Sequence, residues 1–118
     1  MRNILIVDDE EGIRGLYEME FQSEGFQTYS VSSGREALKY FEDRRPVDLV
    51  ILDIKMDNMD GLDVLEELRS KTVGVPVILN SAYSTYKNNF TSWLADAYLV
   101  KTSDLTELKE KVRELLTA

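Results

Sequence analysis

The stretch Ile4-Leu5-Ile6-Val7-Asp8-Asp9 places four aliphatic residues directly before two acids. The run Leu49-Val50-Ile51-Leu52 precedes Asp53 in the same way, and Tyr98-Leu99-Val100 precedes Lys101. Short aliphatic runs between helical patterns are typical of strands buried on both faces of a parallel sheet. Because such sheets place their functional groups at the carboxyl ends of the strands, we expect all these charged residues at one edge.

The rest of the chain alternates between strand and helix patterns. Apolar residues at helical spacing predict a helix after each strand. Residues 84–93 form the weakest of these helices, because their Ser, Thr and Asn side chains compete with helical hydrogen bonds. Five βα units in 118 residues predict one domain, residues 1–118, with an α/β fold built on a doubly wound parallel sheet. The strands are expected at 3–7, 27–31, 77–80 and 97–100, with one more ending at Asp53.

The expected cluster of Asp8, Asp9 and Asp53 favours a bound cation. Carboxylates that crowd together repel one another and resist joint ionisation unless positive charge lies among them. The sequence has no histidine and no cysteine, which argues against a zinc site and against imidazole as a catalytic base. Oxygen ligands favour magnesium, manganese or calcium instead. With Lys101 alongside, these residues indicate a metal-assisted site for an anionic group.

The charge balance bears on partners and location. The chain has 22 acids and 14 bases, a net charge of −8. Such a surface repels a phosphate backbone, so we expect no direct binding of nucleic acid. The sequence has no apolar run long enough for a membrane span or a signal peptide. We therefore expect a cytoplasmic protein that does not bind membranes.

Taken together, the motifs resemble the receiver domain of bacterial two-component response regulators. The likeness covers the whole chain and rests on residues that follow the strands: Asp8-Asp9, Asp53 with Met59-Asp60-Gly61, Ser81-Ala82 and Lys101. The resemblance implies a flavodoxin-like (βα)5 fold with the strand order 2-1-3-4-5. The first and third strands then flank the switch point of the sheet, where sites of such folds lie.

The resemblance also implies the roles of the acids. Asp53 is the expected phosphoacceptor, whose carboxylate attacks a phosphoryl group. Mg²⁺ is the expected cofactor, bound by Asp9 directly, by Asp8 through water, and by Asp53 and the backbone carbonyl of Lys55. Mg²⁺ keeps several waters and takes few carboxylates, which suits this set. From the residues alone, Asp8 and Asp9 could instead cap a helix, and Asp53 could be an ordinary loop acid.

Three further residues have expected roles beside the phosphoryl group. Lys101 is expected to pair with one phosphoryl oxygen, and the Ser81 hydroxyl to donate a hydrogen bond to another. Tyr98 is the expected switch aromatic, which turns inward when Ser81 is drawn to the phosphoryl group.

Two positions are expected to set the lifetime of the phosphorylated state. Lys55 lies two residues after Asp53, and Tyr83 lies two residues after Ser81. The resemblance implies that side chains at these positions control the access of attacking water. A long cation and an aromatic ring together predict a shield, and hence slow self-dephosphorylation.

Three positions depart from the family's pattern. Thr102 follows Lys101, where the family usually has a proline after a cis peptide bond. A cis bond before another residue costs roughly 2.5–4 kcal/mol, so this loop is expected to be either trans and rearranged, or strained. Asp57 stands where proline is common and adds an acid near the site. Asn80 stands where an aliphatic residue is common, and the sequence gives no reason for it.

These expectations describe a signalling domain and not an enzyme with external substrates. The phosphoryl group would come from a histidine kinase or a phosphotransfer protein, and self-dephosphorylation would be slow. The expected output face comprises the fourth helix (residues 84–93), the fifth strand (residues 97–100) and the fifth helix, which follows Asp104. This face would bind a downstream protein, an output domain or a second copy. Two alternatives are a phosphate-independent docking module derived from a receiver, and a small Mg²⁺-dependent phosphohydrolase. The 118 residues leave no room for the substrate cap of the latter.

Overall fold

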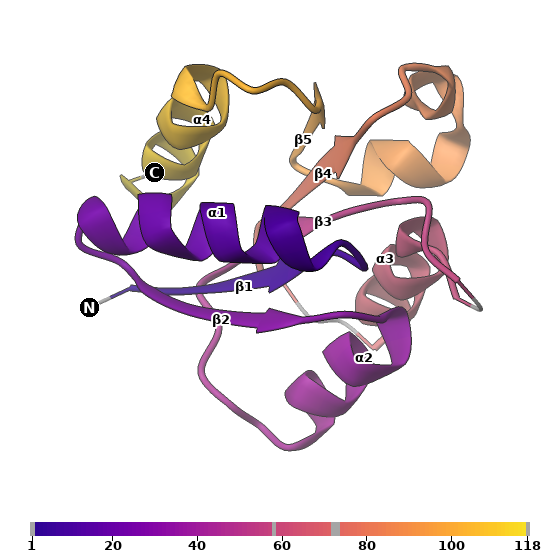
Figure 1. Cartoon of the computed structure of the whole chain (residues 1–118). Coiled ribbons are helices and arrows are strands. Elements are labelled where there is room, and N and C mark those ends of the chain that lie inside the picture. Colours follow the sequence, from indigo (N-terminus) through magenta and orange to yellow (C-terminus); the bar gives the residue numbers. More distant parts are fainter. Residues whose placement is uncertain (1, 58, 72–73, 118) are drawn as a thin grey trace.

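The computed structural model describes residues 2–57, 59–71 and 74–117. Five parallel strands form one sheet in the order β2-β1-β3-β4-β5, which confirms the predicted fold class and strand order. Figure 1 shows α1 and α4 on one side of this sheet and α2 and α3 on the other. The strands are β1 (Asn3–Val7), β2 (Gln27–Val31), β3 (Leu49–Leu52), β4 (Val77–Ser81) and β5 (Ala97–Val100). The α-helices are α1 (Glu11–Ser23), α2 (Gly34–Glu42), α3 (Gly61–Ser70) and α4 (Thr106–Thr117).

Alternate residues of each central strand enter opposite cores. Ile4 and Ile6 of β1 pack against α1 and α4, whereas Leu5 and Val7 pack in the core that α2 and α3 cover. All four are almost fully buried. This burial on both faces explains why the strand is an uninterrupted aliphatic run, with its charged residues only beyond its end.

The predicted helix at 84–93 is wrong. The chain forms two 3₁₀ helices there, η1 (Thr85–Asn88) and η2 (Phe90–Leu94). Asn89 separates them with an extended backbone, and its side-chain oxygen accepts a hydrogen bond of 2.8 Å from the backbone N–H of Thr91. Polar side chains that lower helix propensity therefore make local bonds here that replace one continuous helix.

Arg69 of α3 joins two segments at the amino edge of the sheet. Its guanidinium donates to the carbonyl oxygens of Val75 and Leu94, both at 3.0 Å, and to the carboxylate of Asp96 at 3.2 Å. Asp96 also accepts a hydrogen bond of 2.8 Å from the backbone N–H of Val77. These contacts fix the place where η2 leads into β5 and the place where β4 begins.

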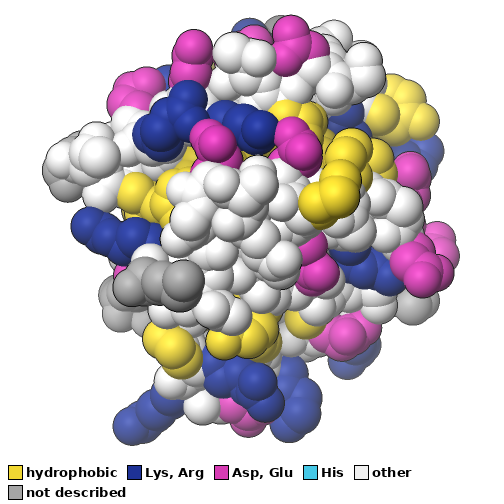
Figure 2. All heavy atoms as spheres, turned by 60° about the vertical axis from the view of Figure 1, so that its left-hand side comes forward, with side chains coloured by type: hydrophobic (Ala, Val, Ile, Leu, Met, Phe, Trp, Pro, Cys, Tyr) yellow, Lys and Arg dark blue, Asp and Glu magenta, His cyan; other side chains and the backbone are white. Residues whose placement is uncertain are grey.

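Two ion pairs join α1 and its C-cap residue, Glu24, to α4. Lys109 lies 2.8 Å from Glu20, and Arg113 lies 2.6 Å from Glu24. In Figure 1 these helices end on the left-hand side of the molecule, and Figure 2 shows the molecule turned so that this side comes forward. Acidic and basic side chains are intermingled on it. Charged side chains at the rim therefore support the apolar contacts by which α4 packs on the sheet and α1.

Candidate functional site

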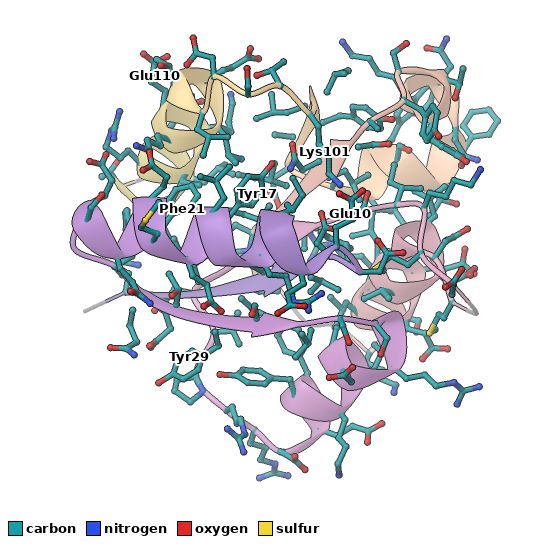
Figure 3. All side chains as sticks on the ribbon, in the orientation of Figure 1. Glu10, Tyr17, Phe21, Tyr29, Lys101 and Glu110 are labelled. Atoms are coloured by element: carbon teal, nitrogen blue, oxygen red, sulfur yellow. The ribbon has the colours of Figure 1, made fainter. Side chains whose placement is uncertain are left out.

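The predicted charged residues do meet at the carboxyl ends of β1, β3 and β5. Asp8 and Asp9 follow β1, Asp53 follows β3, and Lys101 follows β5. Carboxylate oxygens of the three acids all lie within 4.8 Å of one another. Asp8 and Asp53 are buried, whereas Asp9 is exposed. Figure 3 shows Lys101 and Glu10 at this end of the sheet.

Lys101 compensates two of the carboxylates. Its Nζ lies 2.7 Å from Oδ2 of Asp8 and 3.4 Å from Oδ2 of Asp53, and its side chain is 14% exposed. Burial lowers the pKa of Lys101, but the hydrogen bond to Asp8 and the charge of Asp53 outweigh this, so the pKa lies above its ordinary value. Burial, assisted by the charge of Asp8, raises the pKa of Asp53 to about 6, although Lys101 opposes the shift. Lys101 thus offsets only part of the cost of ionising Asp53 at this site.

The donor set fits Mg²⁺. Asp8, Asp9 and Asp53 offer hard carboxylate oxygens. Burial and, to a lesser extent, the charge of Asp8 raise the pKa of Asp53, and a cation beside it would favour its ionised form. Among the described residues, Asp57 is exposed and does not belong to this group of acids. Coordination by the backbone carbonyl of Lys55 stays a prediction.

The loop after Lys101 begins with a trans peptide. No cis peptide bond occurs among the described residues, so the Lys101–Thr102 bond is trans. Lys101 lies one residue beyond the end of β5, and its N–H donates to the carbonyl oxygen of Ser81 at 2.7 Å. The Thr102 hydroxyl donates to the carbonyl oxygen of Asp104 at 2.6 Å. The lysine therefore reaches the acids without a proline at position 102.

Ser81 and Tyr98 both bond to the backbone of Tyr83. Ser81 is fully buried at the end of β4, and its hydroxyl oxygen accepts a hydrogen bond of 3.1 Å from the N–H of Tyr83. The Tyr98 hydroxyl donates to the carbonyl oxygen of Tyr83. The structure thus brings the two predicted switch residues together through the loop that leads to η1. Their part in switching stays a prediction.

Lys55 and Tyr83 meet beside the acids. Nζ of Lys55 lies 5.5 Å from the centroid of the Tyr83 ring, a distance at which a cation is attracted to an aromatic face. Together with Asp9, Asp53 and Lys101 they line a cleft of about 180 Å³. The predicted pair is therefore placed where it can cover one side of Asp53, and its effect on lifetime stays a prediction.

Gly61 allows α3 to begin directly against the backbone of Asp53. A Cβ atom at Gly61 would lie 2.0 Å from the carbonyl oxygen of Asp53 and 2.9 Å from the Cα atom of Ile54. The N–H of Gly61 donates to the carbonyl oxygen of Ile54 at 2.7 Å. Asp60 and Asp63 close a capping box around the same first turn. The start of α3 therefore helps to set the position of Asp53.

We expect Gly61→Ala to lower the free energy of unfolding by at least about 2 kcal/mol, because the added methyl group meets backbone atoms that cannot rotate away. Gly15→Ala in α1 is the matched control. Its Cβ atom would meet nothing within 4 Å, so we expect a gain of about 0.5–1 kcal/mol from helix propensity. Urea unfolding of both variants checks this, and a Gly61→Ala protein as stable as the parent would contradict the close approach.

Two contacts near the site were not predicted from the sequence, although Asn80 stood out there as a polar residue at an aliphatic position. The side-chain amide of Asn80 donates to the Tyr17 hydroxyl at 2.7 Å, and both residues are buried. Arg14 of α1 donates to the carbonyl oxygen of Asp8 at 2.7 Å. Asn80 and Tyr17 are 63 positions apart, so no local pattern could have indicated their pairing.

Comparisons with known proteins agree with this geometry. A family model described as response regulator receiver domain matches residues 4–113. Regulatory protein AtoC of Escherichia coli K12 is 39% identical over 118 residues, which are 98% of this chain but 25% of AtoC. Sporulation initiation phosphotransferase F of Bacillus subtilis is 36% identical over 115 residues, which are 96% of this chain and 92% of that protein. The chain thus spans a quarter of one relative and nearly all of another.

Solved structures show the same fold. TrrA of Thermotoga maritima in complex with Mg²⁺-BeF is 47% identical, with a TM-score of 0.94 over 98% of this chain and 100% of that one. TrrA in complex with the histidine kinase ThkA has a TM-score of 0.91, again at 47% identity, over 98% of this chain and 99% of that one. Since a receiver-domain model and these relatives match almost the whole chain, it belongs to the receiver domains of two-component response regulators.

Proposed function

We propose that Asp53 accepts a phosphoryl group from the phosphohistidine of a histidine kinase or a phosphotransfer protein. The observation that carries this proposal is the meeting of Asp53 with two other acids within 4.8 Å and with Lys101 at 3.4 Å. An oxygen of the Asp53 carboxylate attacks phosphorus, the P–N bond to the imidazole breaks, and the nitrogen keeps the electron pair. The complex of TrrA with a histidine kinase supports such a donor.

The chain's own residues position the group and balance its charge. Lys101, which pairs with Asp53 and Asp8, would turn toward a phosphoryl oxygen as Asp53 loses its free carboxylate. The buried Ser81 hydroxyl would donate to a second oxygen. Phosphoryl transfer requires mainly such positioning and electrostatic stabilisation. Bound Mg²⁺ would neutralise negative charge on the phosphoryl oxygens, and its expected ligands are Asp9, Asp53, the Lys55 carbonyl and, through water, Asp8.

Intact mass after incubation with Mg²⁺ and acetyl phosphate tests the proposal. We expect one phosphoryl adduct that requires both Mg²⁺ and Asp53, so the Asp53→Ala protein should show none. Acetyl phosphate supplies the same group, with acetate as the leaving group in place of imidazole. A folded protein that forms no adduct and binds no Mg²⁺ would instead favour the phosphate-independent docking module.

We infer that the domain does not turn over external phosphoesters. The cleft beside Asp53 measures about 180 Å³. Pockets for small-molecule ligands usually measure about 300–1,000 Å³. The cleft therefore suits a phosphoryl group presented by a protein or a small donor. Release of phosphate from p-nitrophenyl phosphate in excess over the protein would favour the phosphohydrolase.

The contact between Lys55 and Tyr83 predicts a long-lived phosphorylated state. We expect Lys55→Asn and Tyr83→Ala each to speed self-dephosphorylation about two- to fivefold, the factor that corresponds to a cation–π attraction of roughly 0.5–1 kcal/mol. The double variant should decay no faster than the faster single variant, because each change already removes the contact. Lys87→Asn in η1 is the control and should leave the decay rate unchanged. Unaltered decay in both test variants would contradict the shield.

We infer that the segment 82–95 is part of the output face. These residues include no acid and one base, Lys87, in a chain with 22 acids. Phe90 is 78% exposed and Trp93 is 66% exposed, and their rings stack edge to face with centroids 4.9 Å apart. Interface cores are depleted of charge and enriched in aromatic residues. This surface therefore suits a downstream protein, an output domain or a second copy of the chain, together with β5 and α4.

Trp93 offers a direct readout, since it is the one tryptophan of the chain. We expect its fluorescence to change when Mg²⁺ and beryllofluoride are added, because its segment is tied to Tyr98 through the Tyr83 carbonyl oxygen. The Asp53→Ala protein should show no change. Sedimentation of the same samples distinguishes a homodimer from a monomer. Identical emission with and without beryllofluoride, in a protein that does form the Asp53 adduct, would contradict the coupling.

The proposed location is the cytoplasm, where an acyl phosphate or a kinase could reach the site. None of the described helices is long and apolar enough to cross a membrane. The absence of direct nucleic-acid binding stays a prediction from the net charge of −8.

A further inference from the structure

Asn80 and Tyr17 form a buried polar pair that the phosphoryl chemistry does not use. Asn80 is 3% exposed and Tyr17 is 2% exposed, and the amide donates to the hydroxyl at 2.7 Å. Among the described residues, neither side chain has another hydrogen-bond partner. The Tyr17 proton and the second polar end of the Asn80 amide are therefore left to be satisfied, and burying such groups without partners is costly.

A small pocket borders this pair. Tyr17 and Asn80 line a space of about 20 Å³, and Thr102 and Asp104 of the loop after Lys101 also line it. A pocket of about 10–15 Å³ is enough for one water molecule if it offers two to four polar partners. Every sealed polar side-chain atom among the described residues has a partner. The unpaired amide oxygen of Asn80 must therefore face space that a water molecule can enter.

We propose that this pocket binds one ordered water molecule that links Tyr17, Asn80 and Thr102 and so fixes the loop that carries Lys101. The water would accept the hydrogen bond of the Tyr17 hydroxyl. It would donate one hydrogen bond to Oδ1 of Asn80 and one to Oγ1 of Thr102. The Thr102 hydroxyl is able to accept, because it gives its own proton to the carbonyl oxygen of Asp104. All three bonds are of ordinary kinds, and the water satisfies both groups left over by the buried pair.

The water link would hold the chain just after Lys101, where the sheet no longer holds it. Up to Lys101 the sheet does so, because Asn80 pairs with Leu99 in the β4–β5 ladder and the N–H of Lys101 donates to the carbonyl oxygen of Ser81. Beyond Lys101 the ladder ends, and Thr102 is the next residue. Tyr17 is thus a positioning residue, since it acts on Lys101 through the water and Thr102 and touches neither Asp53 nor a phosphoryl group. Figure 3 shows Tyr17 above α1, on the side of the sheet where α4 lies.

A crystal structure of the parent protein at high resolution tests the water directly. We expect an ordered water within hydrogen-bond distance of Oη of Tyr17 and of the Asn80 amide. A dry pocket, or a hydroxyl of Tyr17 that donates to a protein atom, would overturn the proposal.

Phosphorylation by acetyl phosphate tests the link to Lys101, and this readout rests on the proposed function. We expect Tyr17→Phe to slow adduct formation about three- to tenfold, the effect of losing one ordinary hydrogen bond. The Mg²⁺ affinity should stay within about twofold, because the one hydrogen bond of the Tyr17 side chain among the described residues is to Asn80 and not to an acid. Tyr29→Phe removes an exposed hydroxyl on β2 and should change neither quantity. A parent protein that forms no adduct would contradict the proposed function. The crystal structure would still test whether the pocket binds an ordered water molecule.

A double-variant cycle separates positioning from a general loss of stability. In a Lys101→Met background, Tyr17→Phe should cause no further loss of phosphorylation rate, because the residue through which it acts is already gone. A further loss of the same three- to tenfold size would show that Tyr17 acts independently of Lys101 and would overturn the link. An unchanged rate for Tyr17→Phe in the parent background would overturn it as well.

Discussion

Replacing Asp53 by asparagine is expected to raise the free energy of unfolding of the metal-free protein by about 1–3 kcal/mol at about pH 7.5. Asp53 is buried, and the charge of Asp8 lies beside it. Both effects penalise the ionised carboxylate, and Lys101 offsets only part of the penalty. The amide keeps the shape of the side chain and removes its charge. The residue proposed to carry the chemistry is therefore a source of instability in the metal-free fold.

The effect of Asp53 on stability depends on pH, because its pKa differs between the folded and the unfolded chain. The Asp53 carboxyl ionises near its ordinary pKa of 3.8 when the chain is unfolded and near 6 when it is folded. Between these values the folded state holds a proton that the unfolded state has lost, so Asp53 destabilises the fold progressively as the pH rises. The advantage of Asp53→Asn should be complete above about pH 7 and should shrink toward zero near about pH 4.

Urea unfolding of both proteins across this pH range measures the difference. Asp57→Asn, an exposed acid in the same loop, is the control and should change stability by less than about 0.5 kcal/mol. Saturating Mg²⁺ should reverse the order, because the cation stabilises the protein that binds it more tightly. A stability difference that does not depend on pH would show that ionisation of Asp53 does not destabilise the fold.

Replacing Lys101 by methionine is expected to have the largest combined effect on stability and activity. Nζ of Lys101 lies 2.7 Å from Asp8 and 3.4 Å from Asp53, so its loss leaves buried carboxylates without a counter-charge. Breaking a buried ion pair from one side costs about 3–5 kcal/mol. Removing one charge-stabilising donor from a reaction site slows the reaction about 10²- to 10³-fold. We expect Lys101→Met to lose about this much of each, measured by urea unfolding without Mg²⁺ and by the rate of adduct formation.

Lys109→Met is the matched control for Lys101→Met. Lys109 lies 2.8 Å from Glu20, nearly the same distance as that between Lys101 and Asp8, but this pair is more exposed to solvent. Exposed pairs contribute little to stability because water and salt screen them, so this variant should be only slightly destabilised and fully active. Adding Asp53→Asn to Lys101→Met should restore part of the lost stability, because it removes one of the repelling charges. Equal losses in the two lysine variants would show that burial at the site does not matter.

The parts of the fold that were predictable are those that repeat along the chain. The aliphatic runs before Asp8, Asp53 and Lys101 have to be strands, because their residues alternate between two cores. Because those strands are parallel, the residues that follow them all lie at one edge of the sheet. The convergence of the acids and the lysine was therefore contained in local patterns, and the family motifs supplied the strand order.

Two parts of the structure were not predictable. In residues 84–93, polar side chains make local hydrogen bonds, such as the one that the N–H of Thr91 donates to the Asn89 side chain, and the helical pattern did not show that these would replace one helix. The other part depends on contacts between distant residues. The partner of Asn80 is Tyr17, on another element, and the hydroxyl of Tyr98 found the backbone of Tyr83. Such choices follow from packing in three dimensions and leave no spacing that could be read beforehand.

The contacts of Arg69 limit how modular the receiver is. A designer who transplants η1 and η2 into another receiver, to redirect it to a new target, would copy the residues of that segment. The C-terminal end of η2 is nevertheless held by Arg69 on α3 and by Asp96 just before β5. Both residues have to be transferred together with the segment. Without them the C-terminal end of η2 would not be fixed, and the aromatic side chains of the segment would be presented in a different arrangement.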